Sequence, residues 1–197
     1  MPNPFPPALI QAPVNTFLLT DKIVGVRPSS FEGLQNTVRG VMENAGIVRV
    51  LAASGTKLSN TGDTNENTMA TISVPASAMG PNGFVRVTSL WTTNGNTNTK
   101  TCRVRFNATA LTTISHATAT QLTAQAITVI QNRNSLASQV GAAISNYGAD
   151  VAVNAAQVTS THDTSGALNI TLTAQCVTSG TDTIDLERYI VEVCYVA

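Results

Sequence analysis

The sequence predicts an all-β protein, an antiparallel jelly-roll-like β-sandwich with an N-terminal extended proline-rich arm. The first observation is the period-two alternation of apolar and polar residues in residues 84–106, which is typical of half-buried strands. The second is the composition, because only 11% of the 197 residues are charged and 29 are Thr, which favours pleated surfaces. The third is a series of such segments separated by Gly, Asn, Ser and Asp turns, which indicates a sandwich or jelly roll.

The first segment of the chain is rich in proline. Five of the eight prolines lie in the first thirteen residues, and proline fixes φ and removes a backbone donor. We therefore expect residues 1–14 to form a polyproline-like extended arm rather than a helix or a central strand. Phe5, Leu9 and Ile10 give the arm apolar side chains to bury, and we expect them to contact a partner subunit. A frayed terminus is the alternative.

Residues 15–56 are expected to form a small connector module of short strands. Within it, residues 30–44 place apolar side chains at the three- and four-residue spacing of an amphipathic helix. Two glycines in that stretch weaken the helix and leave an extended connector open.

The jelly-roll domain is expected to span residues 57–197. Residues 58–67 are polar and predict a loop. Residues 135–146 suit one face of a helix or a long loop, and the surrounding strands favour the loop. Together with one strand in the connector module, the sequence predicts nine strands, at residues 47–53, 68–74, 84–92, 100–106, 111–115, 121–132, 151–160, 168–176 and 183–196.

Residues 80–106 predict two strands that a polar Asn/Gly/Thr loop joins into a hairpin. Each strand has a buried and an outward face, and the second strand buries Cys102, Val104 and Phe106. The Asn-Gly pairs at 82–83 and 94–95 suit the positive φ of tight turns. The last strand changes the parity of its apolar residues near 187–188, which predicts a β-bulge, and its length suits a central strand.

The composition argues against several classes of function. Eleven basic and eleven acidic residues leave no net charge, whereas nucleic-acid binding needs a basic excess. No apolar run reaches the roughly 18 residues that suggest a membrane span, and the N-terminus lacks the basic region of a secretory signal. Three cysteines without CxxC spacing predict buried free thiols rather than disulfides or a zinc site. We expect no cofactor.

Few residues suit catalysis or metal binding. His162, Asp163 and Ser165 can be drawn as a triad, but adjacent residues of a turn rarely point at one another, so we interpret His162 as a turn histidine. His116 is also interpreted as structural. A calcium site at Asp182, Asp185 and Glu187 lacks the Gly-rich acidic loop that usually holds the ion. We therefore expect neither a catalytic site nor a metal site.

Three arginines and one tryptophan are candidates for surface contacts. Arg86, Arg103 and Arg105 either pair with the carboxylates of residues 182–187 or form a small basic patch that meets an acidic partner surface. Trp91 is interpreted as a core or interface residue, with a sugar-stacking platform as the alternative.

Three segments together resemble the jelly-roll domain of small structural proteins in tailed-bacteriophage virions. They are residues 80–106 (with NGFVRVTSLW and NTKTCRVRF), 130–141 (IQNRNSLASQVG) and 180–193 (GTDTIDLERYIVEV). The family includes capsid decoration (cement) proteins, head fibres and parts of tail fibres. The likeness covers residues 65–197 and implies a homotrimer on the capsid shell that catalyses no reaction. Residues 17–27 loosely resemble the opening of some tail-fibre proteins.

These observations predict a non-enzymatic capsid decoration protein that bridges subunits of the phage major capsid protein. We expect it to be made in the bacterial host cytoplasm and to lie on the capsid surface of the virion. The alternatives are a tail-fibre or head-fibre protein that contacts the host surface, and a carbohydrate-binding jelly roll.

Deleting residues 1–14 is expected to weaken binding to capsids and to lower the heat resistance of decorated heads, because the arm would supply apolar contacts. Co-sedimentation with capsids and thermal disruption of the heads measure the two effects. Unchanged binding and heat resistance would contradict a role for the arm.

Overall fold

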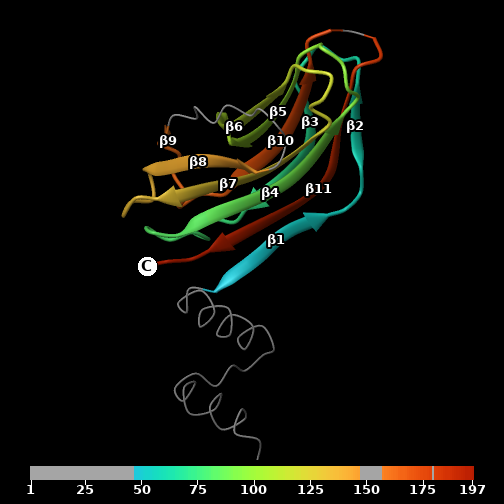
Figure 1. Cartoon of the computed structure of the whole chain (residues 1–197). Coiled ribbons are helices and arrows are strands. Elements are labelled where there is room, and N and C mark those ends of the chain that lie inside the picture. The colour runs from blue at the N-terminus through green and yellow to red at the C-terminus, as the bar shows by residue number, and fades with distance from the viewer. Residues whose placement is uncertain (1–46, 147–156, 179) are drawn as a thin grey trace, which may run out of the picture. The chain divides into compact units, whose positions relative to one another are not determined.

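Two antiparallel sheets pack face to face in the computed structural model, which describes residues 47–146, 157–178 and 180–197 (Figure 1). These residues belong to one compact unit, Glu43–Ala197. The expected arm at residues 1–14 and the expected helix or connector at residues 30–44 lie outside the described residues.

The larger sheet contains β1 (Val48–Ser54), β11 (Thr183–Cys194), β4 (Phe84–Thr93), β7 (Thr123–Asn132), β8 (Gln139–Asn146) and β9 (Val158–Ser160), in that order, with β2 (Leu58–Thr61) also on β11. The smaller sheet contains β3 (Asn67–Val74), β10 (Leu168–Cys176), β5 (Lys100–Phe106) and β6 (Thr109–His116).

The strand order is that of a jelly roll. Without β2, β8 and β9, the first, last, third and sixth strands of the chain form one sheet, as β1-β11-β4-β7. The second, seventh, fourth and fifth form the other, as β3-β10-β5-β6. This is the double Greek key of a jelly roll. β8 and β9 lengthen the first sheet beyond β7.

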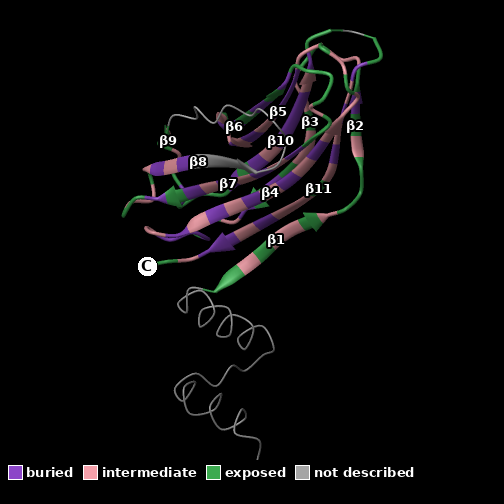
Figure 2. Cartoon of the chain, in the orientation of Figure 1, coloured by how far each residue is buried: buried purple, intermediate pink, exposed green. Residues whose placement is uncertain are grey.

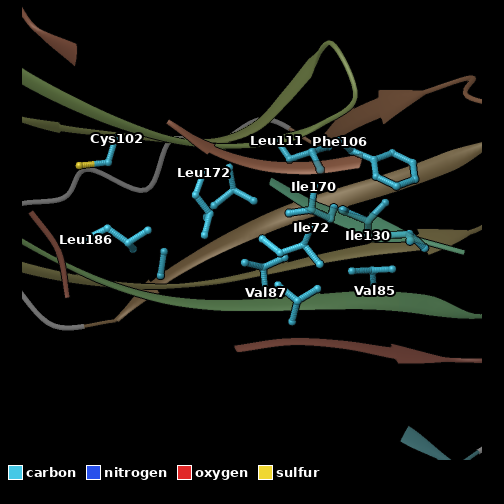
Figure 3. Packing of buried hydrophobic residues seen from close by; sticks show 14 of the residues in the cluster. Ile72, Val85, Val87, Cys102, Phe106, Leu111, Ile130, Ile170, Leu172 and Leu186 are labelled. Carbon is cyan, nitrogen blue, oxygen red and sulfur yellow. The ribbon is translucent and has the colours of Figure 1, made fainter. Parts of the chain in front are cut away.

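The core lies between the two sheets and is filled by alternate residues of each strand. Ile170 and Leu172 of β10 belong to the same cluster of buried residues as Val85 and Val87 of β4 (Figure 3). All four side chains are fully buried, and so is Trp91 further along β4. Burying a side chain of this size stabilises the fold by roughly 1.5–3 kcal/mol, so the shared core is the main force that holds the sheets together.

The expectation that residues 80–106 form a hairpin was wrong. β4 pairs with β11 and β7, whereas β5 pairs with β10 and β6, so the chain crosses from one sheet to the other between them. Alternation identifies the buried face of each strand. Because both sheets turn such a face toward the same core, alternation cannot tell which sheet a strand belongs to. The tight hairpin instead joins β5 to β6 through Asn107, which has a φ of 49°.

Two expected loops contain strands. Residues 58–61 form β2, which pairs with residues 183–186 of β11. Residues 139–146 form β8, which pairs with β7 along its whole length. Both segments have a polar or small-residue composition, and they become strands because a neighbouring strand offers free backbone groups to pair with. β1, which we had placed in the connector module, pairs with β11 and is part of the sandwich.

The two Asn-Gly glycines are needed for close approach rather than for a positive φ. The glycines with positive φ are Gly62, Gly80 and Gly180, so neither Gly83 nor Gly95 is among them in the described chain. A Cβ on Gly83 would lie 1.7 Å from the carbonyl oxygen of Met79, and one on Gly95 would lie 2.3 Å from that of Ala119. At both points another backbone segment passes where a side chain would stand.

Other expectations about the strands are confirmed. β5 begins and ends where predicted, with Cys102, Val104 and Phe106 buried. The register between β11 and β4 shifts between Leu186 and Arg188, which is the predicted bulge. β11 is central, since it pairs with β1 and β2 on one side and with β4 on the other. The three cysteines are buried free thiols.

Replacing Leu172 with alanine is expected to lower the free energy of unfolding by roughly 2–5 kcal/mol, because it leaves a cavity between the sheets. Urea denaturation followed by Trp91 fluorescence measures the change. Leu122→Ala is the matched control, since Leu122 is 51% exposed whereas Leu172 is fully buried. Equal losses in the two variants would contradict the assignment of the core.

Candidate functional site

The three candidate arginines do not form one patch. Arg86 lies on β4 in the larger sheet, whereas Arg103 and Arg105 lie on β5 in the smaller one. Arg86 binds Glu192, with Nε and Oε2 2.7 Å apart. The carboxylates of Asp185 and Glu187 are bound instead by Lys57, so the expected pairs with residues 182–187 do not form.

Glu66 binds both arginines of the smaller sheet. Its carboxylate receives two hydrogen bonds from Arg105, from Nε at 2.6 Å and from Nη2 at 2.7 Å. Arg103 Nη1 lies 3.3 Å from the same carboxylate. The hydrogen bonds from Arg105, helped by Thr173 and by the charge of Arg103, lower the pKa of Glu66 to about 2 against the opposing effect of burial. Glu66 thus offsets one of the two positive charges, and the arginines form a hydrogen-bonded network with it rather than a free basic patch.

The residues of the possible triad do not act together. His162 lies edge-on to the ring of Phe106, and its Nε2 is 3.1 Å from the hydroxyl of Thr109. The carboxylate of Asp163 accepts a hydrogen bond from the backbone of Ser165, as in an ordinary turn. His162 thus connects the turn before β10 to β5 and β6 through its contacts with Phe106 and Thr109.

Trp91 belongs to the core. It is fully buried, and its indole Nε1 donates a hydrogen bond to the hydroxyl of Ser89, 3.0 Å away. Its ring is therefore not available to stack on a sugar.

A buried polar cluster lies at the end of the sandwich where the chain crosses from β4 to β5. We call it the end cluster, and it consists of Asn96, Asn98, Lys100, His116 and Asp182. Lys100 begins β5, and its ammonium donates to Oδ1 of Asn96 at 2.5 Å and to the backbone carbonyl of Asn98 at 3.0 Å. Asp182, in the loop before β11, accepts from Nδ2 of Asn96 at 2.6 Å and of Asn98 at 3.3 Å. The cluster ties the β4–β5 crossover to the β10–β11 loop.

Both charges of the end cluster are removed from water. The side chains of Lys100 and Asp182 are 1% and 3% exposed, and Nζ lies 3.8 Å from Oδ1. Burial opposes ionisation of Asp182, but the hydrogen bonds from Asn96 and Asn98 and the charge of Lys100 outweigh it and lower its pKa. Breaking one member of such a pair leaves an uncompensated buried charge, which is costly.

Two polar atoms next to Lys100 have no partner within the described part of the chain. They are Oδ2 of Asp182 and Nε2 of His116, whose residue pairs with Lys100 across β5 and β6. Nδ1 of His116 donates to the backbone carbonyl of Gln121 at 3.2 Å, so Nε2 is an unprotonated acceptor. Burial is the main cause of the lowered pKa of His116, and the charge of Lys100 adds to it.

The end cluster brings together an amine, an amide and a carboxylate rather than a set of metal ligands. No group of three or more His, Cys, Asp or Glu side chains in the described ranges could hold a metal ion. Asp182 points into the cluster, whereas Asp185 and Glu187 bind Lys57, so the three acidic residues do not converge. One sequence signal for this cluster was available, because Lys100 shares the parity of Cys102, Val104 and Phe106 and so lies on the buried face of its strand.

The open edge of the larger sheet exposes aliphatic side chains. Among the described residues, no strand pairs with the outer side of β1. Ile47, Val48 and Val50 are 43%, 41% and 56% exposed, and Figure 2 shows β1 largely green at its start. Three of the six exposed large hydrophobic residues of the described chain thus lie at this edge.

Comparisons with known proteins do not identify a family. No family model matches the chain, and no curated protein is similar to it. Among solved structures, one that is similar is arcelin-5, a lectin-like defense protein from Phaseolus vulgaris, with a TM-score of 0.38 and 7% sequence identity. The match covers 75% of this chain and 91% of arcelin-5, and likeness at this level carries no argument about function. No helix among the described residues is long and apolar enough to cross a membrane.

Glu66→Gln is expected to lower the free energy of unfolding at neutral pH by roughly 1.5–3 kcal/mol, the usual range for hydrogen bonds to charged groups. A carboxyl whose pKa falls on folding contributes stability above its unfolded pKa, near 4.5, and this contribution is lost as the pH falls to about 2. Urea denaturation between pH 2 and 7 should therefore show the variant and the wild type converging in acid. Glu192→Gln, which breaks a pair with one arginine, is the control and should cost less.

Proposed function

We propose that this protein is a bacteriophage capsid decoration (cement) protein, which binds the outside of the shell, bridges major capsid subunits and stabilises the head. The likeness of residues 80–106, 130–141 and 180–193 to virion jelly rolls supports the proposal. The observation that carries it is the outer edge of β1, where Ile47, Val48 and Val50 are exposed and no strand of the described residues pairs. An edge of this kind can receive an extended strand from another protein by β-augmentation.

The mechanism is binding linkage. A protein that binds only the assembled shell stabilises it by RT ln(1 + [L]/Kd), so no chemistry is needed. As a homotrimer it would gain avidity, because its second and third contacts become intramolecular. A charge-poor surface with paired arginines suits close packing on a partner, since few charges have to be desolvated.

Two other functions remain alternatives. A tail-fibre or head-fibre protein would use the same sandwich to contact the host surface, and a carbohydrate-binding jelly roll would bind glycans. Imaging of virions with a labelled chain separates the first from decoration, because decoration requires density spread over the shell rather than at the tail. A glycan array tests the second.

Val50→Lys is expected to weaken binding to capsids at least tenfold with little change in melting temperature, because it places a charge on the open edge. Opposite Val50 lies Glu192, which accommodates the new charge in the free protein. Co-sedimentation with capsids that lack this protein measures binding. Val177→Lys is the matched control, since Val177 is 59% exposed but lies at the end of β10. Wild-type binding by the β1 variant would exclude this edge as the contact.

A further inference from the structure

The amine of Lys100 is held against the side-chain amide of Asn96. Lys100 is 1% exposed, so its Nζ is shielded from water. Nζ lies 2.5 Å from Oδ1 of Asn96. Because Oδ1 is bonded to Cγ at about 1.2 Å, Nζ is at most about 3.7 Å from that carbon, close to the 3–3.5 Å that characterises reacting atoms.

The carboxylate of Asp182 lies beside both partners. Its Oδ1 accepts a hydrogen bond from Nδ2 of Asn96 at 2.6 Å and lies 3.8 Å from Nζ of Lys100. Its Oδ2 is buried and has no hydrogen-bond partner in the described part of the chain. A carboxyl group in this position can accept a proton from the amine and deliver one to the amide nitrogen.

We propose that Lys100 and Asn96 form an intramolecular isopeptide bond in the folded protein, with Asp182 as the proton-transfer group. The cluster contains a nucleophile, an electrophilic carbon and a carboxylate that touches the leaving nitrogen. This modification is independent of the proposed function.

The reaction needs no co-reactant. The neutral amine attacks Cγ of Asn96, the new Nζ–Cγ bond forms, and the carbonyl electron pair moves to Oδ1. Asp182 accepts a proton from Nζ and gives one to Nδ2. The Cγ–Nδ2 bond then breaks, the carbonyl re-forms, and ammonia leaves. The product is an amide between the two side chains. The proton that the Lys100 ammonium gives to Asp182 before the attack leaves with the ammonia as ammonium, so the buried positive charge of Lys100 is removed.

Folding is what brings the reacting groups together. Lys100 is held on β5 by pairing with Cys176 of β10 and His116 of β6. Asp182 comes from a loop more than eighty residues away in sequence, so in the unfolded chain it is not held beside Lys100 and Asn96. Attack requires the neutral form of the amine. The bond would close the β4–β5 crossover into a ring, beside the hydrogen bond from Asn94 to Thr181 that already joins the two loops.

Intact-mass spectrometry of the purified, folded full chain tests the proposal. The expected mass is lower than that of the sequence by one ammonia. Peptide mapping with trypsin after denaturation is expected to show no cleavage after Lys100 and a fragment in which it is joined to Asn96, whereas the exposed Lys57 is cleaved. If the wild-type protein has the full mass of its sequence and a free Lys100, this measurement by itself overturns the proposal.

Variants separate this bond from other losses of ammonia. Lys100→Arg removes the nucleophile and is expected to restore the full mass, as is Asp182→Asn. Asn98→Ser is the matched control. The side chain of Asn98 also donates to Asp182, but its side-chain amide oxygen accepts no hydrogen bond from Lys100, so this variant should keep the lower mass. Loss of ammonia that persists in Lys100→Arg would place it at a succinimide such as Asn94-Gly95 and would overturn the isopeptide assignment.

Discussion

Strand β11 is bonded on both sides along nearly its whole length, and the larger sheet depends on it. One side of β11 pairs first with β2 and then with β1, while the other side pairs with β4. A single straight strand could not satisfy both sets of neighbours while keeping its apolar side chains inward. The bulge between Leu186 and Arg188 resets the parity, so that Leu186 and Val191 both face the core. The strands that flank β11 come from the start of the described chain and from its middle, so β11 closes the fold.

One end of the sandwich and the outer edge of β1 differ in their exposure to solvent. At the end where the chain crosses from β4 to β5, the side chains of Lys100 and Asp182 are shielded from water. The end cluster therefore supplies hydrogen bonds that water would otherwise make. Along the outer edge of β1, by contrast, no strand of the described residues pairs, and the side chains of Ile47, Val48 and Val50 are exposed. The first arrangement joins two loops by hydrogen bonds, and the second is the kind of strand edge that can pair with another chain. A protein with so few charges has little else on its described surface to prevent association.

The charged residues of the sheets are used in pairs and networks rather than as patches. Glu66 lies between Arg103 and Arg105, Glu192 faces Arg86, and Lys57 bridges Asp185 and Glu187. Each of these carboxylates comes from a segment distant in sequence from its partner or from another strand. Pairing of this kind keeps the sheet faces near neutral, in agreement with the zero formal net charge of the chain.

The sequence by itself determined the fold class, most strand positions, the buried face of β5, the bulge in β11 and the state of the cysteines. These follow from local alternation and from residue size, which act within a single strand. Only the tertiary structure decided that β4 and β5 lie in opposite sheets, that residues 58–61 and 139–146 are strands, and which carboxylate each arginine binds. The same holds for the meeting of Asn96, Lys100 and Asp182: the parity of β5 marks Lys100 as buried, but its neighbours are set by long-range strand pairing. Partner choice depends on backbone hydrogen bonds and shared core packing between distant segments, and no short stretch of sequence records it.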